Sequence, residues 1–398
     1  MQTFIPSYQT LGPGTGWKWP GSQRLPYPLS HDRIQGYFLG RNAVYYGAAA
    51  LGLGAGDEIL FPSYHSGTES APLMHLGCRL KFYGVKRNLD IDLEEVEAKI
   101  GPETKAIYAI HFVGFPAPIQ ALRDLADRHG LFLIEDVALG FLGKHEDRPL
   151  GTWGDISIFC LYKSLPVPAG GILAINNPDI DLPPPPTKSN LYSELNLTAK
   201  RMLEHVELFG GSCGAAVRKG TQRIFRRAVS TAGLRVKSPD ALDFEPDLLD
   251  CQLGCVTRHV IRRLDYDRVF HGRRANYEWL ARELAQAGVP LVRETLPAQA
   301  VPLFLPVLVE DKFGTVEKLQ AQGIDAIPFW GIHHAHLPHG EFPDTEFNVK
   351  HAIEIPIHQD LNEGHLARIR DALVNIGVWR DCPAEDVASG ACAPTASL

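Results

Sequence analysis

Two ionisable side chains of this chain, Asp136 and Lys163, lie where buried strands are expected to end. Asp136 follows the apolar run 131–134, and Lys163 follows the run 156–161, just before a turn rich in proline and glycine. A carboxylate at the tip of a buried strand must be hydrogen-bonded or protonated, because burying a lone charge is costly. The pattern predicts a site where an amine and a carboxylate face one small molecule.

These two groups are the ones that pyridoxal phosphate (PLP) requires of a protein. PLP needs an amine that forms a Schiff base and an anion beside its pyridine nitrogen. We expect Lys163 to be the Schiff-base lysine and Asp136 to be the partner of the ring nitrogen. The alternative for Asp136 is that it caps a turn after its strand, a common role for aspartate.

The phosphate of such a cofactor needs an anion site, and the segment 39–43 offers the start of a helix. Free backbone N–H groups and the helix dipole favour an anion at that end. Gly40, Arg41 and Asn42 are therefore the candidate phosphate contacts. Every helix has such an end, so this segment by itself is weak evidence.

The pattern of apolar residues predicts the elements that position these groups. Helices are expected over 42–53, 67–76, 93–100 and 119–129, and strands over 58–61, 79–83, 104–110, 131–134, 156–161 and 171–175. Strands that alternate with helices indicate a mainly parallel sheet with helices on both faces. Such sheets bind ligands at the carboxyl ends of their strands.

The chain is expected to have four parts. An arm over residues 1–36 precedes a large PLP-binding domain over 37–250, which includes a helical segment at 190–230. Residues 251–382 form a small C-terminal α/β domain that begins with one long helix over 248–284. Its remaining elements are expected at 301–309, 315–322, 324–329 and 364–376. Residues 383–398, rich in Ala, Ser and Pro, are expected to be a disordered tail.

Residues 38–175 resemble the DegT/DnrJ/StrS family of PLP-dependent aminotransferases, many of which act on nucleotide-linked keto-sugars. The matching stretches are 53–63, 104–114, 134–138, 151–156 and Lys163 with Gly170 and Gly171. The likeness extends more faintly to 273–277 and 355–361. The resemblance implies an aspartate-aminotransferase-like fold (PLP fold type I), a homodimer with shared active sites, and glutamate as the amino donor.

Several positions depart from the family pattern around these residues. The family's Ser-Gly-Thr phosphate loop is not found, and its nearest counterpart is the segment 39–41. Leu139 stands where the family has a glutamine, and Cys160 stands in place of a serine before the lysine. These changes keep the lysine and the aspartate but remodel their surroundings.

Aromatic and histidine side chains complete the candidate site. Tyr64 and His65 lie where the family places a ring that stacks on PLP, and each is either that ring or a polar loop residue. We interpret His111 as a structural histidine. The cluster of histidines at 333, 334, 336 and 339 lacks acidic or cysteine partners at ligand spacing, so no metal is expected.

The composition is that of an ordinary globular enzyme. The chain has 398 residues, 45% hydrophobic and 21% charged, with a formal charge of −7. It offers no basic field for nucleic acid and no apolar run that could span a membrane, so a cytoplasmic location is expected. Its seven scattered cysteines are expected to be reduced thiols.

We therefore expect an aminotransferase that moves an amino group from an amino-acid donor to a keto acceptor such as a keto-sugar. Two alternatives remain open. One is another PLP carbanion reaction, such as elimination or dehydration. The other is a PLP-fold protein that has lost catalysis and serves binding or regulation.

Overall fold

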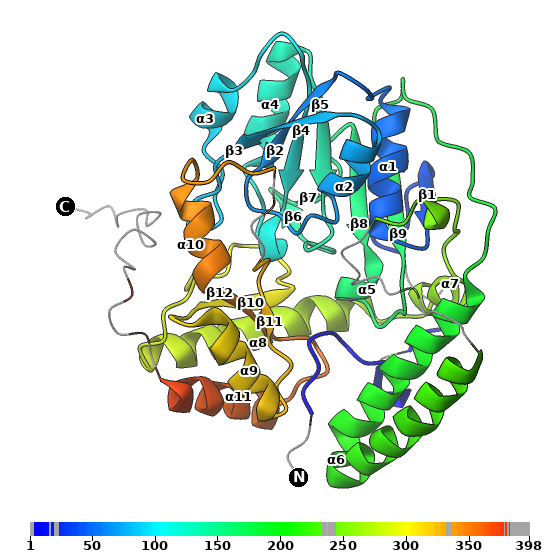
Figure 1. Cartoon of the computed structure of the whole chain (residues 1–398), viewed down its shortest axis with the longest axis vertical. Coiled ribbons are helices and arrows are strands. Elements are labelled where there is room, and N and C mark those ends of the chain that lie inside the picture. Colours follow the sequence, from blue (N-terminus) through cyan, green and yellow to red (C-terminus); the bar gives the residue numbers. More distant parts are fainter. Residues whose placement is uncertain are drawn as a thin grey trace.

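The computed structural model describes residues 4–15, 17–19, 24–232, 237, 244–331, 334, 336–377, 379 and 382. Its larger part is a seven-stranded sheet flanked by helices (Figure 1), with strand order β1-β9-β8-β5-β4-β2-β3. These strands are β1 (Ile34–Tyr37), β2 (Glu58–Pro62), β3 (Arg79–Tyr83), β4 (Thr104–Ile110), β5 (Phe132–Asp136), β8 (Ile156–Cys160) and β9 (Gly171–Ile175).

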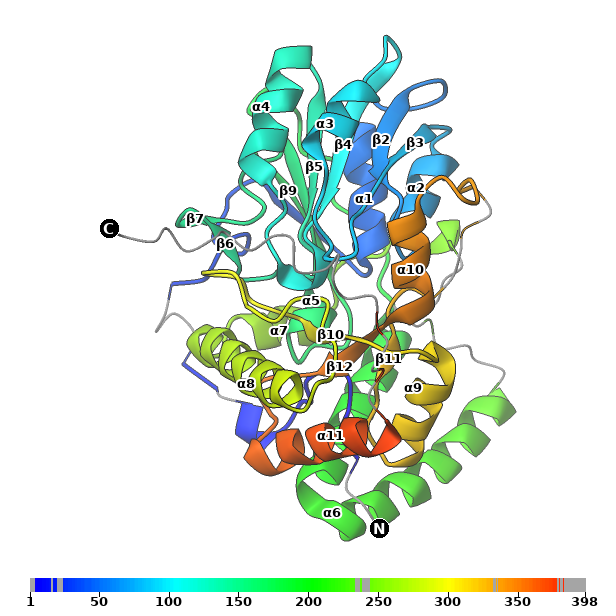
Figure 2. The same cartoon turned by 90° about the vertical axis from the view of Figure 1, so that its left-hand side faces the viewer.

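The sheet is mainly parallel, as the alternation of elements predicts. Strands β3, β2, β4, β5 and β8 run parallel, whereas β9 and β1 are antiparallel to their neighbours. The helices of this part include α1 (Gly40–Ala50), α2 (Ser70–His75), α3 (Leu93–Ala98) and α4 (Ile119–His129). Helix α1 packs on β8 and β9, and α4 packs on β4 and β5; Figure 2 shows α1 and α4 on opposite faces. The carboxyl ends of the parallel strands therefore meet at one edge.

Helix α4 shows how local sequence fixes these elements. Its buried residues Ile119, Leu122, Leu125 and Ala126 recur every three or four positions, so they form one apolar stripe against the sheet. The helix ends at Gly130, whose φ of 65° is readily adopted only by glycine. The bounds predicted from the sequence, 119–129, are those observed.

The smaller part is an α/β layer built on a three-stranded sheet. In that sheet β12 (Ala352–Pro356) lies between β10 (Phe304–Leu308) and β11 (Ile327–Pro328), antiparallel to both. Its helices are α7 (Cys255–Ile261), α8 (Tyr266–Gln286), α9 (Lys312–Ala321), α10 (Pro343–His351) and α11 (Glu363–Ile376). No helix or strand was predicted over α10 or β12 from the sequence pattern, so both were missed.

The prediction of one long helix over 248–284 is wrong. The carboxylate of Glu194 accepts the N–H groups of Cys255, Val256 and Thr257, so α7 begins there. The side chain of Asp265 accepts the N–H of Arg268 and starts α8 anew. Such caps satisfy backbone groups at a new helix start, which favours two short helices over one continuous helix.

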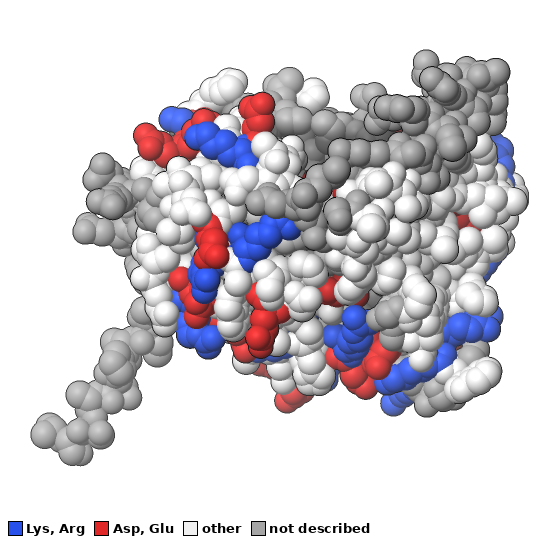
Figure 3. All heavy atoms as spheres, turned by 90° about the horizontal axis from the view of Figure 1, so that it is seen from below, with Lys and Arg blue, Asp and Glu red and all other residues white. Residues whose placement is uncertain are grey.

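The helical segment expected at 190–230 is α6 (Leu191–Ala232), which is broken at Gly211 (φ 56°, ψ −132°). Figures 1 and 2 show α6 as a helical hairpin that projects below the rest of the molecule. Seen from below in Figure 3, acidic and basic side chains are interspersed over this end of the molecule, with no large field of one sign.

The N-terminal arm packs on the smaller part of the same chain. Ile5 forms a β-bridge with Ile324, and the N–H of Ser7 donates to Asp325. Further along, the N–H and hydroxyl of Thr10 donate to Asp360. The arm predicted over 1–36 is thus ordered where the structure describes it.

The predicted disordered tail, 383–398, lies outside the described residues. No helix in the described part of the chain combines the length and apolar character needed to cross a bilayer.

A buried carboxylate, Glu135, fixes the edge of the sheet where the polar residues gather. It accepts hydrogen bonds from the N–H groups of Gly151, Trp153 and Gly154 and from Nε2 of His111. His111 in turn accepts the N–H of Ala117 through Nδ1. These contacts agree with a structural role for His111.

We predict that Glu135→Ala lowers the free energy of unfolding by about 3 kcal/mol or more, because it leaves several buried donors unsatisfied. Urea unfolding followed by circular dichroism measures this change. The exposed Glu97→Ala is the control and should change stability by less than about 0.5 kcal/mol. Equal midpoints for the two variants would contradict this role of Glu135.

Candidate active site

The carboxyl edge of the sheet borders a cavity of about 380 Å³ that also reaches the smaller part and the N-terminal arm. A pocket of this size suits a small-molecule ligand or cofactor. Of the residues predicted from the sequence, Gly40, Arg41, Asp136, Cys160 and Lys163 line it. The structure therefore brings the predicted amine and carboxylate into one site.

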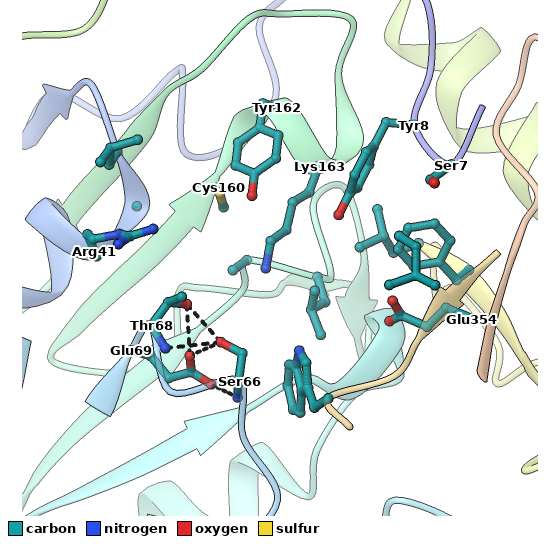
Figure 4. A pocket seen from close by; sticks show the side chains of 18 of the residues that line it. Ser7, Tyr8, Arg41, Ser66, Thr68, Glu69, Cys160, Tyr162, Lys163 and Glu354 are labelled. Carbon is teal, nitrogen blue, oxygen red and sulfur yellow. Dashed lines mark hydrogen bonds between the residues drawn. The ribbon is translucent and has the colours of Figure 1, made fainter. Parts of the chain in front are cut away.

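Lys163 reaches the cavity from a single helical turn, α5 (Leu161–Ser164), that directly follows β8. Figure 4 shows its amine pointing into the middle of the pocket. Burial alone would lower the pKa of this amine, but nearby Cys160, Glu69, Asp136 and Glu354 raise it above its ordinary value. The ligand-free site therefore holds an ammonium ion surrounded by acidic groups.

Asp136 is the last residue of β5, and its carboxylate is 6% exposed. The hydroxyl of Tyr108 donates to Oδ2 at 2.6 Å, and the N–H of Ala138 donates to Oδ1 at 2.8 Å. Burial and the negative charge of Glu69 raise the pKa of Asp136, while these two donors and Lys163 counteract that rise. The bond to Ala138 is the turn cap considered above, so the two roles of Asp136 coexist.

The start of α1 offers an anion site on another side of the cavity. Its N-cap residue, Leu39, provides no side-chain cap, and the side chain of Arg41 is buried in the first turn. A Cβ on Gly40 would lie 3.4 Å from Sγ of Cys160, so glycine keeps the helix start close to the end of β8. Backbone N–H groups and a guanidinium are suitable donors for a phosphate.

Three predicted cofactor contacts, Asn42, Tyr64 and His65, do not line this cavity. The amide of Asn42 donates to the carbonyl oxygens of Leu248 and Leu249. The hydroxyl of Tyr64 donates to the carbonyl oxygen of Phe329. Their side chains are used in packing between distant segments of the chain.

His65 packs its ring between Phe82 and His334, with centroids 5.8 Å and 4.1 Å away. Burial lowers its pKa to about 3, so the ring is neutral. His333 lies outside the described residues. Among the residues that are described, no three His, Cys, Asp or Glu side chains are grouped to hold a metal ion.

A Ser-Gly-Thr tripeptide does occur in the chain, as Ser66, Gly67 and Thr68 after β2. Ser66 and Thr68 line the cavity, and their hydroxyls donate to the carboxylate of Glu69 (Figure 4). Burial alone would raise the pKa of Glu69, yet the bonds from Ser66 and the charge of Lys163 lower it. A carboxylate at this place would repel a phosphate, so the anion site remains at α1.

Sequence reasoning also missed Glu69 and two residues of the smaller part, Glu354 and Trp330, that line the cavity. Glu354 lies on β12, and burial raises its pKa to about 8. Trp330 has a φ of 38° and packs against Tyr64 and Phe112. A single acid between Ile353 and Ile355 is the signal that could have identified Glu354, because charged residues are rarely buried.

The residues present fit PLP. The cavity holds an amine, a buried carboxylate at a neighbouring strand end, and a helix N-terminus with an arginine in its first turn. Each of these matches one functional group of the cofactor, namely its carbonyl carbon, its ring nitrogen and its phosphate.

Comparison with known proteins finds a family that part of the chain matches. Residues 40–182 match the model of the DegT/DnrJ/EryC1/StrS aminotransferase family. The resemblance seen in the sequence is thus confirmed over the segment from α1 through β9. The GDP-perosamine synthase of Vibrio cholerae is 34% identical over 143 residues, which are 35% of this chain and 39% of that protein. The chain therefore matches about two fifths of the length of this curated relative.

Solved structures show the fold for nearly the whole chain. Spr1654 from Streptococcus pneumoniae, in its PLP-form, has a TM-score of 0.63 at 14% identity and covers 94% of this chain and 98% of its own. A GDP-4-keto-6-deoxymannose-3-dehydratase, ColD, has a TM-score of 0.60 at 16% identity and covers 85% of this chain and 88% of its own. The expected fold, PLP fold type I, is confirmed.

We predict that Glu354→Gln changes how the stability of the protein depends on pH. The folded-state pKa, about 8, lies above the ordinary value of 4.5, so folding takes up a proton between these values. Stability from this group is present below pH 4.5 and is lost as the pH rises to about 8. Glu354→Gln should remove this dependence, which amounts to a change in the free energy of unfolding on the order of 5 kcal/mol over that pH range.

Thermal unfolding between pH 4.5 and 8.5 measures this effect. The exposed Glu317→Gln, also in the smaller part, is the matched control and should follow the wild type. Parallel profiles for wild type and Glu354→Gln would contradict a protonated, buried Glu354.

Proposed function

We propose that this chain is a PLP-dependent aminotransferase, which moves an amino group from an amino-acid donor, glutamate, to a keto acceptor such as a keto-sugar. The observation that carries the proposal is the meeting of Lys163 and Asp136 in one cavity beside Arg41 and the start of α1. The match of residues 40–182 to an aminotransferase family supports the reaction type. The name of the Vibrio cholerae relative supports a sugar acceptor.

When bound, PLP supplies an electron sink for a carbanion formed beside the transferred nitrogen. The chain's own residues do the rest. The Nζ of Lys163 would hold the cofactor covalently and, as a free amine, would take up and return a proton at the reacting carbon. Arg41 and the first N–H groups of α1 neutralise the phosphate and fix its position.

Asp136 would keep the ring nitrogen protonated. Tyr108 and Ala138 orient the carboxylate of Asp136 by their hydrogen bonds to it. Each carboxylate oxygen accepts one hydrogen bond from the protein and retains a lone pair for the ring nitrogen. The low exposure of Asp136 keeps water away, so the ion pair is stronger than it would be in solvent. Loss of this charge should weaken proton transfer more than binding.

We predict that dialysed wild-type protein reconstituted with PLP shows the visible absorption band of a lysine-bound cofactor, and that Lys163→Ala lacks it. Asp136→Asn should keep the band but lose turnover by about 10² or more, since it loses the anion that supports proton transfer. The exposed Lys105→Ala controls for reaction of PLP with surface lysines.

Turnover is measured with glutamate and a panel of keto acceptors: GDP-4-keto-6-deoxymannose, pyruvate and oxaloacetate. An unchanged band in Lys163→Ala would move the Schiff base elsewhere. Near-normal turnover by Asp136→Asn would contradict the role of Asp136 as partner of the ring nitrogen and leave only its role as a turn cap. Loss of a hydroxyl group from the keto-sugar without net transfer of an amino group to it would favour dehydration instead.

A homodimer is part of this proposal, because it is what the family resemblance implies. Six of the large apolar side chains that are more than 40% exposed lie on α6, namely Leu191, Leu195, Met202, Val206, Phe209 and Val217. Exposed apolar groups gathered on one element mark an interaction surface. We infer that α6 packs against a second copy.

We predict a mass twice the 43.9 kDa of the chain in sedimentation equilibrium at micromolar concentration. The double substitution Met202→Asp and Phe209→Asp should shift the protein toward the monomer, because it places two charges in the apolar contact. Phe313→Asp alters an equally exposed aromatic on α9 and serves as the control. A monomeric wild type with full activity would contradict the dimer.

A further inference from the structure

The side chain of Glu354 lines the cavity opposite the groups assigned to the cofactor. It comes from β12, where it pairs with Pro306 of β10 and Ile327 of β11. Figure 4 shows its carboxyl group directed into the pocket, across from Lys163. The side chain is only 5% exposed, so water does not solvate it freely.

This carboxyl group has no hydrogen-bond donor among the described residues. The other four acids of the cavity differ. Asp136 accepts from Tyr108 and Ala138, and Glu69 accepts from Ser66 and Thr68. Asp325 accepts from Ser7, and Glu204 is paired with Arg201. An acid that is buried without a donor is held neutral, because burial penalises its charged form. A neutral carboxyl carries one O–H donor and can still accept.

The charged and titratable groups that face Glu354 do not supply a partner. Lys163, on α5, and Lys312, on α9, lower the pKa of Glu354 without removing the effect of burial. The Nζ of Lys312 donates to the carbonyl oxygens of Phe329, Asn348 and Val349, which occupy its donors. The hydroxyl of Tyr64 is likewise committed to the carbonyl of Phe329.

The remaining cavity wall around Glu354 is apolar. Leu303, Phe304, Ile327 and Trp330 line it on the side of the smaller part. Trp330 keeps a left-handed backbone, a conformation that costs free energy in a non-glycine residue and is common at ligand sites. On this side of the cavity the carboxylate of Asp325 accepts the N–H of Ser7, and the indole N–H of Trp330 is a donor. Glu354 is therefore the one carboxyl group of this wall without a donor among the described residues.

We propose that Glu354 is the specificity-determining residue of the acceptor side of the pocket, where its carboxyl group donates a hydrogen bond to a hydroxyl or carbonyl oxygen of the keto acceptor. This inference rests on the proposed function, because it takes the groups across the cavity as the cofactor site. Lys163, Asp136 and Arg41 would serve the cofactor's carbonyl carbon, ring nitrogen and phosphate. The carboxyl group of Glu354 lies across the cavity from Lys163, on the side that is left for the substrate.

The pH dependence follows from the same hydrogen bond. Glu354 donates only while it is protonated, so acceptor binding should weaken as the pH rises through the pKa of Glu354, about 8. An amide at this position keeps an N–H donor and does not titrate. Glutamine should therefore preserve acceptor binding at neutral pH and remove its dependence on pH.

The test compares wild type, Glu354→Gln and Glu354→Leu, each loaded with PLP. The acceptor is the member of the panel above with the highest kcat/KM in the wild type, and KM and kcat are measured from pH 6.5 to 9. Glu354→Leu should raise the KM for the acceptor by roughly ten- to a hundredfold, because an acceptor oxygen loses its buried donor. Glu354→Gln should stay within about threefold of the wild type at pH 7 and show a flat KM profile.

A second measurement separates this inference from the proposed function. All three proteins should show the same absorption band of lysine-bound cofactor and the same rate of band loss with glutamate alone. If the wild type lacks the band, the proposed function fails. If the band is present but Glu354→Leu leaves the acceptor KM unchanged, or slows the reaction with glutamate as much as that with the acceptor, the role of Glu354 is refuted.

Glu317→Gln controls for the loss of one acidic side chain from the smaller part. Its KM profile should follow the wild type at every pH. Thermal unfolding at pH 7 shows whether Glu354→Leu is folded. If it is not, the flat KM profile of Glu354→Gln decides, and a profile that still rises near pH 8 would overturn the proposal.

Discussion

One buried ammonium among buried carboxyl groups is the constraint on which the site depends. Lys163 would lose its proton readily if only burial acted, but Glu69, Asp136 and Glu354 face it. Each of these acids would in turn be neutral if only burial acted, and what distinguishes them is the number of protein donors that each receives. Glu69 has hydroxyl and backbone donors, Asp136 has Tyr108 and Ala138, and Glu354 has none. The three acids therefore differ in charge within a single cavity, and this difference allows them different tasks.

The parallel sheet makes this arrangement possible, because it delivers side chains from far apart in the sequence to one edge. Asp136 ends β5, and Lys163 follows β8, the neighbouring strand. Glu135, adjacent to Asp136, points its carboxylate the other way and holds the loop that leads into β8. Successive residues on a strand face opposite sides, so one carboxylate serves structure and the next serves the pocket. The geometry of the site is thus set by the same strand that stabilises its surroundings.

The sequence predicted what depends on local pattern and missed what depends on distant partners. The bounds of β3, β4, β9 and α4 agree with the prediction because alternation, helical period and glycine stops are all local signals. The division of the long helix could not be foreseen, since the cap on α7 comes from Glu194, more than sixty residues away. Asn42 and His65 were assigned to the cofactor from their positions, yet their side chains contact segments near 248 and 334. Glu354 was missed because β12 is a strand only by pairing with β10 and β11.

A buried arginine connects the two sides of the pocket. Arg273, on α8, donates to the carbonyl oxygen of Leu303 at 2.8 Å, to Oε1 of Gln9 at 2.6 Å, and to the carbonyl oxygen of Ser164 at 3.4 Å. Burial lowers its pKa only to about 10, so the guanidinium stays charged at neutral pH. The guanidinium thus contacts the N-terminal arm, the cavity wall around Glu354 that includes Leu303, and the turn that carries Lys163. A shift of this cavity wall would break or stretch the bond to Ser164, because one planar guanidinium cannot keep its hydrogen bonds to three carbonyl oxygens that move apart. The position of Lys163 is therefore coupled to the same wall from which Glu354 points into the cavity.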